Sequence, residues 1–63
     1  MRNPERLNDF YEKMKELHKK YVPDWRWGQL VYNFICEHGD PFYWEEEETL
    51  ERLEEYLKEV TGK

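Results

Sequence analysis

Apolar residues recur every three or four positions along three separate stretches of the chain, which is the spacing of one face of an α-helix. In the first stretch they are Leu7, Phe10, Tyr11, Met14, Leu17, His18 and Tyr21. Asn3 is a favourable N-cap and Pro4 suits the first helical position, while Pro23 disfavours helical geometry at the residue before it. The pattern predicts a first helix over about residues 4–21.

The second stretch follows Asp24, which is expected to cap its helix. Its apolar positions are Trp27, Leu30, Val31, Phe34, Ile35 and His38. Gly39 then offers a left-handed C-terminal cap, so a helix is predicted over about residues 25–38. Because few residues separate the first two helices, we expect them to form a tight antiparallel or steeply crossed hairpin.

The third stretch follows an aromatic triplet, residues 42–44. Asp40 and Pro41 can start one turn of helix there, but we expect an irregular link that lies across the core. Glu45–Glu48 place four carboxylates where the helix dipole favours negative charge. The positions expected to face inward are Leu50, Leu53, Leu57 and Val60. A third helix over about residues 45–61 completes an all-α, compact three-helix bundle, with residues 1–63 forming a single domain.

A chain of 63 residues has little core, so its stability should be marginal and a partner or a dimer interface would add to it. Charged residues make up 40% of the chain, but the regular grouping of apolar and aromatic residues argues against disorder. The single cysteine, Cys36, indicates no disulfide scaffold. No apolar run is long enough for a membrane span or a signal peptide, so a cytoplasmic protein with no membrane contact is expected.

Charge is distributed unevenly along the chain. Residues 1–21 hold six basic and four acidic side chains, a net +2, whereas residues 40–63 hold three basic and nine acidic ones, a net −6. The first and third helices are therefore expected to lie side by side and attract each other. Alternatively, the acidic third helix imitates nucleic acid and occupies a basic partner protein.

Aromatic residues are more numerous than a core of this size should need: five Tyr, three Phe and three Trp. Some should therefore meet a partner. The candidate interaction surface is Trp25, Arg26, Gln29, Tyr32, Asn33, Tyr43 and Trp44. The competing structural interpretation is that Gln29 and Asn33 bond to the backbone of residues 40–44, that Asp24 caps the helix, and that Arg26 stacks on a ring.

Gly28 lies in the first turn of the second predicted helix, where it costs about 1 kcal/mol relative to alanine. This cost suggests that something packs directly on its backbone. An indole ring or the first helix would suffice, and a ligand at the helix start is an alternative that would make the protein a small enzyme or ligand carrier.

Catalytic and metal motifs are weak. Cys36 and His38 are two residues apart and should point to nearly opposite sides of a helix, so neither a metal site nor a catalytic dyad is expected. Glu45–Glu48 should be solvated, which does not suit paired acid–base catalysis. The second helix carries only Arg26 as a basic residue, which disfavours direct DNA contact. We expect no cofactor and no enzymatic activity.

Two segments carry a resemblance: Pro23-Asp24-Trp25-Arg26-Trp27-Gly28-Gln29-Leu30, with Asn33 after it, and Asp40-Pro41-Phe42-Tyr43 followed by Glu45. They resemble an uncharacterised family of very small bacterial and phage proteins with the pattern P-D-x-R-x-G-Q-L, then N, then D-P-F-Y-x-E. The resemblance covers nearly the whole chain, from Arg2 onward. Trp27 and Trp44 depart from it, since a smaller residue is expected at both positions. It implies a phage or prophage setting without an assigned reaction.

These expectations favour a small non-enzymatic protein–protein interaction or regulatory module that binds another protein or itself through exposed aromatic residues. The alternative is a nucleic-acid-linked regulator, acting by direct binding or through an acidic helix that blocks a DNA-binding partner.

Overall fold

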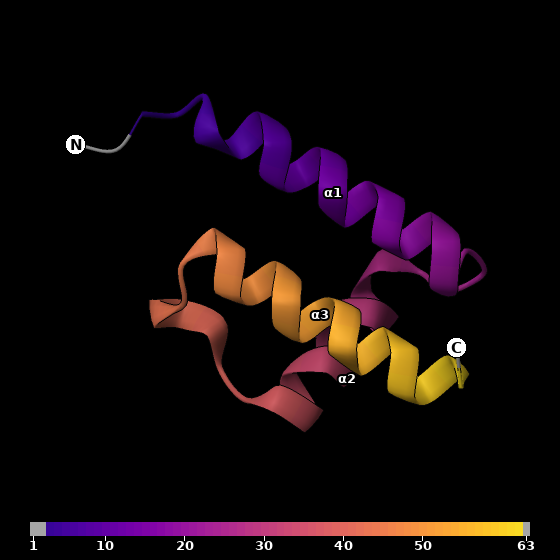
Figure 1. Ribbon diagram of the computed structural model, residues 1–63. Helices are drawn as coiled ribbons and strands as arrows, with labels where there is room; N and C mark the ends of the chain where they lie inside the picture. Colours follow the sequence, from indigo (N-terminus) through magenta and orange to yellow (C-terminus); the bar gives the residue numbers. More distant parts are fainter. Residues whose placement is uncertain (1–2, 63) are drawn as a thin grey trace.

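The computed structural model describes residues 3–62 and contains three α-helices (Figure 1). They are α1 (Arg6–Tyr21), α2 (Trp27–His38) and α3 (Glu46–Thr61), with one turn of 3-10 helix, η1 (Pro41–Tyr43), between the last two. The predicted all-α three-helix bundle is confirmed. Residues 1, 2 and 63 lie outside the described residues. The predicted domain includes all three, and the family resemblance includes Arg2.

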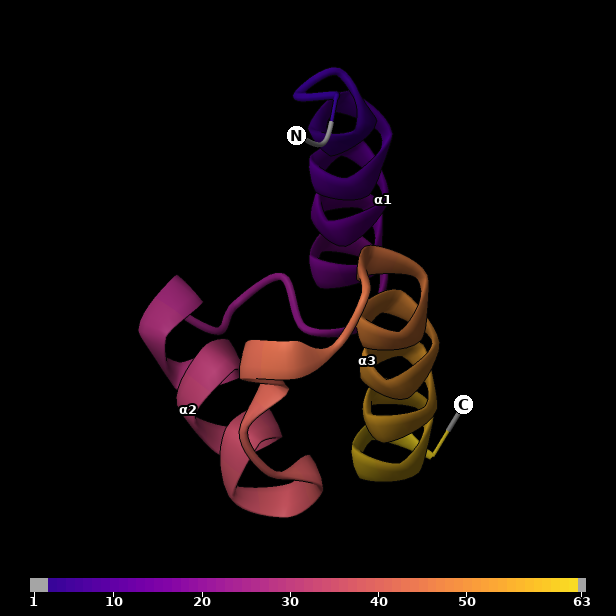
Figure 2. The same ribbon diagram turned by 90° about the vertical axis from the view of Figure 1, so that its left-hand side faces the viewer.

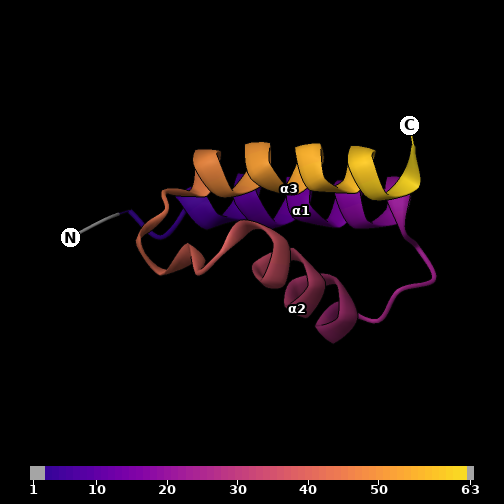
Figure 3. The same ribbon diagram turned by 90° about the horizontal axis from the view of Figure 1, so that it is seen from below.

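The helix α3 packs against both of the other helices. Figures 1 and 3 show α1 and α3 running side by side in the same direction, with α2 running back. In the view of Figure 2, α1 and α2 lie on different sides of α3, and the main helix–helix contacts are those of α3 with each of them. The expected hairpin of the first two helices is therefore wide, and α3 rather than α1 provides most of the packing for α2.

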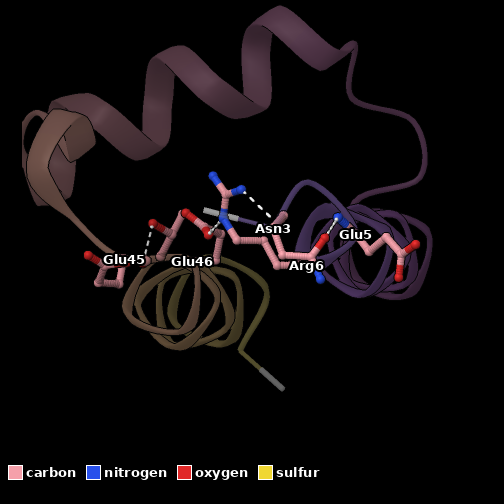
Figure 4. A network of polar contacts seen from close by, with 6 residues as sticks. Asn3, Glu5, Arg6, Glu45 and Glu46 are labelled. Atoms are coloured by element: carbon pink, nitrogen blue, oxygen red, sulfur yellow. Dashed lines mark hydrogen bonds and ion pairs between the residues drawn. The ribbon is translucent and has the colours of Figure 1, made fainter. Parts of the chain in front are cut away.

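One ion pair connects the starts of α1 and α3, as the charge distribution predicts. Arg6 Nε lies 2.6 Å from Glu46 Oε1. Arg6 Nη1 also donates to the carbonyl oxygen of Asn3 at 3.2 Å, so the guanidinium bridges the entry to α1 and the first turn of α3 (Figure 4). Both charged side chains remain partly exposed, at 37% and 26%, so the pair contributes at most about 1 kcal/mol.

Both of the first two helices begin two residues later than predicted. Asn3 Oδ1 accepts the N–H of Glu5 at 3.0 Å, so Asn3 caps a tight turn that precedes α1. At the start of α2 the residue before the helix is Arg26, not Asp24. The backbone N–H of Arg26 donates to Gln29 Oε1 at 2.8 Å, half of the reciprocal pattern known as a capping box. The predicted capping role of Asp24 is wrong, because the chain turns again after it.

The link between α2 and α3 is more regular than expected. Gly39 ends α2 with φ 92° and ψ −176°, an extended conformation with positive φ that is almost exclusive to glycine. It does not adopt the left-handed helical conformation that the sequence predicted. Asp40 Oδ1 then accepts the N–H of Phe42 at 3.0 Å and caps η1. The aromatic triplet is therefore not irregular, since its first two residues belong to one turn of helix.

The core lies where α2 and α3 meet the end of α1. Its buried members are Tyr21, Val22, Leu30, Phe34, Leu53, Tyr56 and Leu57, and the half-buried Met14, Leu17, Trp25 and Trp44 pack against them. Leu30 and Leu57 are enclosed most completely. Full burial of one such leucine stabilises the fold by about 1.5–3 kcal/mol relative to exposure.

Three residues that the helical spacing places in the apolar stripes are exposed. Tyr11, Trp27 and Val60 are 59%, 65% and 47% accessible. Trp27 is the first residue of α2 and Val60 lies in the last turn of α3. Tyr11 lies at the edge of its stripe. The spacing predicts which side of a helix is apolar but not how far the next helix covers it.

Among residues 3–62, no helix is both long enough and apolar enough to cross a membrane.

Candidate functional site

The candidate residue Trp44 belongs to a cluster of rings at the seam of α2 and α3. The Phe34 ring lies 5.9 Å from Trp44, 5.9 Å from Tyr56 and 5.3 Å from His38, measured between ring centroids. The Arg52 guanidinium lies 4.4 Å from the centroid of the Trp44 ring, a cation–π contact. Trp44 is therefore half-buried and engaged within the monomer.

Arg52 is held over the Trp44 ring by its own helix. Its Nε donates to Glu48 Oε2 at 3.0 Å, one helical turn away. The expected arginine–aromatic contact thus occurs, but Arg52 makes it and not Arg26. The sequence signal was the spacing of Glu48 and Arg52, four residues apart on one helix, which favours such an ion pair.

Trp25 lies in the link between α1 and α2 and is also half-buried against the core. Its carbonyl oxygen is 2.8 Å from His18 Nε2, which donates the hydrogen bond, since a carbonyl only accepts. This bond ties the link to the last turns of α1. Trp25 and Trp44 therefore position the chain and present only part of their rings to solvent.

The largest exposed rings lie on α2 and η1. Tyr32 and Tyr43, both candidates from the sequence, are 70% and 90% accessible. Trp27 and Phe42 join them at 65% and 77%, and the Phe42 and Tyr43 rings pack edge to face with centroids 4.9 Å apart. Helical spacing had assigned Trp27 to the core, and nothing in the sequence distinguished Phe42 from its neighbours.

The three polar candidates are exposed: Gln29 and Asn33 lie on α2, and Arg26 is the residue that precedes it. Gln29 acts within its own helix by capping the Arg26 N–H. Within the described residues, neither Gln29 nor Asn33 bonds to the backbone of residues 40–44, and Arg26 does not stack on a ring. The contacts that the competing structural interpretation predicted for these three residues are thus wrong, although Gln29 does have a structural role as a helix cap.

Gly28 lies open to solvent. A methyl group added at its Cα would meet no atom within 4 Å. The prediction that an indole ring or the first helix packs on this backbone is wrong for the monomer, because α1 lies on a different side of α3 (Figure 2). The glycine has no explanation in the packing of one chain.

Two hollows lie along the seam of α1 and α3. One of them is lined by Lys13, Glu16, Leu17, Lys20, Glu47, Leu50, Glu51 and Glu54. Lysines of α1 face glutamates of α3 across it, which extends the attraction that begins at Arg6 and Glu46. Arg26, Gln29 and Asn33 line none of these hollows.

Two tyrosines have altered acidity. Burial raises the pKa of Tyr56 above its ordinary value of 10.0, and the charges of Glu37 and Cys36 act in the same direction. On the surface of α2, a hydrogen bond to the Cys36 side chain and its charge raise the pKa of Tyr32. Neither tyrosine is thereby poised for chemistry near neutral pH, because a raised pKa keeps the hydroxyl protonated there.

No group of three or more His, Cys, Asp or Glu residues within residues 3–62 is arranged to hold a metal ion. Comparison of the chain with protein-family models, with curated proteins and with solved structures finds no match.

Proposed function

We propose that this chain is a non-enzymatic protein–protein interaction module, cytoplasmic and encoded by a phage or prophage. The observation that carries the proposal is the exposure of four aromatic residues on α2 and η1: Trp27, Tyr32, Phe42 and Tyr43 are 65–90% accessible. Burying one such ring in an interface gives more binding free energy than most other side chains provide.

The candidate residues take different roles in this proposal. Tyr32 and Tyr43 contact the partner, together with Trp27 on the same helix as Tyr32 and Phe42 next to Tyr43 in the chain. The exposed Arg26 and Asn33, together with Gln29, form a polar margin that hydrogen-bonds around the apolar contact. Trp25 and Trp44 hold the link and η1 in place from the core side.

The test replaces Tyr32 and Tyr43 together by serine. Because both rings are mainly in solvent, helicity measured by circular dichroism should not change. Association, measured by light scattering after size exclusion and by crosslinking to captured proteins, should weaken at least tenfold. The matched control is Tyr11→Ser, an exposed ring on α1, which should leave association within about twofold. Equal association of all three proteins would refute the proposal.

A second function, nucleic-acid-linked regulation, is favoured by the surface of α3. Its exposed Glu47, Glu51 and Glu55 repeat every four residues, and a shallow hollow beside them is lined largely by carboxylates. Such a row can occupy the phosphate-binding site of a basic DNA-binding protein. Two experiments at 50 and 200 mM salt test this second function: competition between the chain and DNA for that protein, and a gel shift of DNA with the chain alone. Either the competition or the direct binding must weaken as the salt concentration rises.

A further inference from the structure

The two hollows along the seam of α1 and α3 adjoin each other, because both are lined by Lys13, Glu47 and Leu50. Together they form one groove, called here the α1–α3 groove, between the helices that Figures 1 and 3 show side by side. Its lining residues lie within residues 6–20 and 45–54, so α2 contributes none of them. At 1.5 Å per residue the α1 side is about 21 Å long, the length of a helix of about 14 residues.

The floor of the groove is apolar. Phe10 and Leu17 line it from α1 and Leu50 lines it from α3, and all three side chains are half-buried. Phe10 and Leu17 are seven residues apart, which places them on one side of α1. Two parallel helices with apolar side chains between them can bind a third helix through its apolar side.

The rims of the groove are charged, and the acidic residues predominate. The lining holds three basic residues, all from α1: Arg6, Lys13 and Lys20. It holds seven acidic residues: Asp9, Glu16, Glu45, Glu46, Glu47, Glu51 and Glu54. The net charge of the lining is therefore −4, which attracts a basic ligand and repels a second copy of this acidic chain.

The carboxylates in the middle of the groove are not neutralised by α1. Arg6 pairs with Glu46 at one end. Within residues 3–62, however, Lys13, Glu47 and Glu51 take part in none of the ion pairs, although they line the same hollow. Glu47 and Glu51 are exposed and lie four residues apart, on one side of α3. A Lys or Arg side chain of a ligand can therefore reach them without displacing a cation of this chain.

We propose that the α1–α3 groove binds a basic amphipathic helix of another protein. The apolar side of that helix covers Phe10, Leu17 and Leu50, and its Lys or Arg side chains lie against Glu47 and Glu51. This surface is separate from the exposed rings on α2 and η1, so the inference goes beyond the proposed function and does not rest on it.

The probe for the test is a synthetic, fluorescently labelled peptide of 14 residues. Leucine recurs in it every three or four positions, lysine follows one flank of the leucines, and alanine and glutamine fill the rest. Its fluorescence anisotropy with the full chain should give a dissociation constant in the micromolar range. A peptide of the same composition in scrambled order keeps the charge and loses the apolar side, and it should bind at least tenfold more weakly. Equal binding of the two peptides would overturn the inference, because charge alone would then explain it.

Variants of the chain test the acidic rim. Glu47→Gln with Glu51→Gln should weaken binding of the amphipathic peptide at least tenfold, with helicity by circular dichroism unchanged since both side chains are exposed. The matched control is Glu37→Gln with Glu59→Gln, two exposed helical residues outside the groove. It removes the same charge and should change binding by less than threefold. An equal loss in both double variants would contradict a specific contact with α3.

Nuclear magnetic resonance locates the bound peptide. The amide signals of Leu17 and Leu50 should shift during the titration, whereas those of Trp27 and Tyr32 should not. Tyr32→Ser with Tyr43→Ser should leave peptide binding within twofold, even if it abolishes the association assigned to the exposed rings. Shifts centred on Trp27 and Tyr32, or no binding at several hundred micromolar, would refute the groove as a helix-binding site while leaving the proposed function intact.

Discussion

At the scale of single residues, Tyr56 shows how packing alters chemistry. The ring is 5% accessible and lies 5.9 Å from Phe34 and 5.8 Å from His38, between centroids. Burial raises the pKa of its hydroxyl above 10.0, and the nearby Glu37 adds to the rise. The folded state therefore holds this proton more tightly than the unfolded chain does, so that ionisation of Tyr56 favours unfolding.

The stabilising effect of the protonated Tyr56 should be complete below pH 10 and be lost as the pH rises through the pKa of the folded state. Tyr56→Phe keeps the ring packing and removes the ionisable group, so its free energy of unfolding should fall less between pH 9.5 and 11 than that of the unaltered protein. Urea unfolding across this range measures the difference. Tyr43→Phe, at an exposed ring, is the control, and equal losses in all three proteins would contradict the expected role of Tyr56.

At the scale of elements, the helix starts depend on side chains that bond to nearby backbone. Gln29 satisfies the N–H of Arg26 at the start of α2, and Asp40 satisfies that of Phe42 in η1. Each such bond compensates a backbone group that has no partner inside its helix. The polar residues around the aromatic segments therefore help to determine where α2 and η1 begin.

Gln29→Ala should make the chain less stable than Asn33→Ala by about 1 kcal/mol, because only the first variant loses a helix-capping hydrogen bond. Both changes introduce alanine on the same helix, and the smaller propensity gain from replacing Gln than from replacing Asn adds to the difference in the same direction as the lost cap. Chemical unfolding followed by circular dichroism measures it. Equal stabilities would show that the Gln29 bond contributes nothing in solution.

At the scale of the whole molecule, the three helices are held together by seven residues that are buried among residues 3–62. A chain of 63 residues is expected to have a total stability of about 3–9 kcal/mol. Loss of the free energy from one central side chain is then a large fraction of the total. Any bound partner would stabilise the fold further, by an amount that grows with the logarithm of its concentration.

Leu57→Ala should lower the free energy of unfolding by about 2–5 kcal/mol, because Leu57 is fully enclosed and its truncation leaves a cavity. Val60→Ala, one turn later on the same helix, should change it by less than about 0.5 kcal/mol, since Val60 is 47% exposed. Thermal unfolding of both variants at one concentration provides the comparison. A similar loss in both would mean that Val60 is covered in solution, as its place in the apolar stripe originally predicted.

Helical spacing and the proline positions were enough to predict the number of helices and their approximate bounds, because both act over short distances along the chain. The opposite net charges of the first and last segments also predicted the pairing of α1 with α3, which are distant in the sequence. The aromatic surplus predicted exposed rings at Trp25, Tyr32, Tyr43 and Trp44, and of these Tyr32 and Tyr43 are exposed whereas Trp25 and Trp44 are half-buried. Which of the three tryptophans is exposed follows from the packing of the helices, since Trp25 and Trp44 lie against the core and Trp27 does not. The same holds for Gly28, whose empty surroundings follow from the wide separation of α1 and α2. Burial is a property of neighbours that are distant in sequence, and local patterns do not contain it.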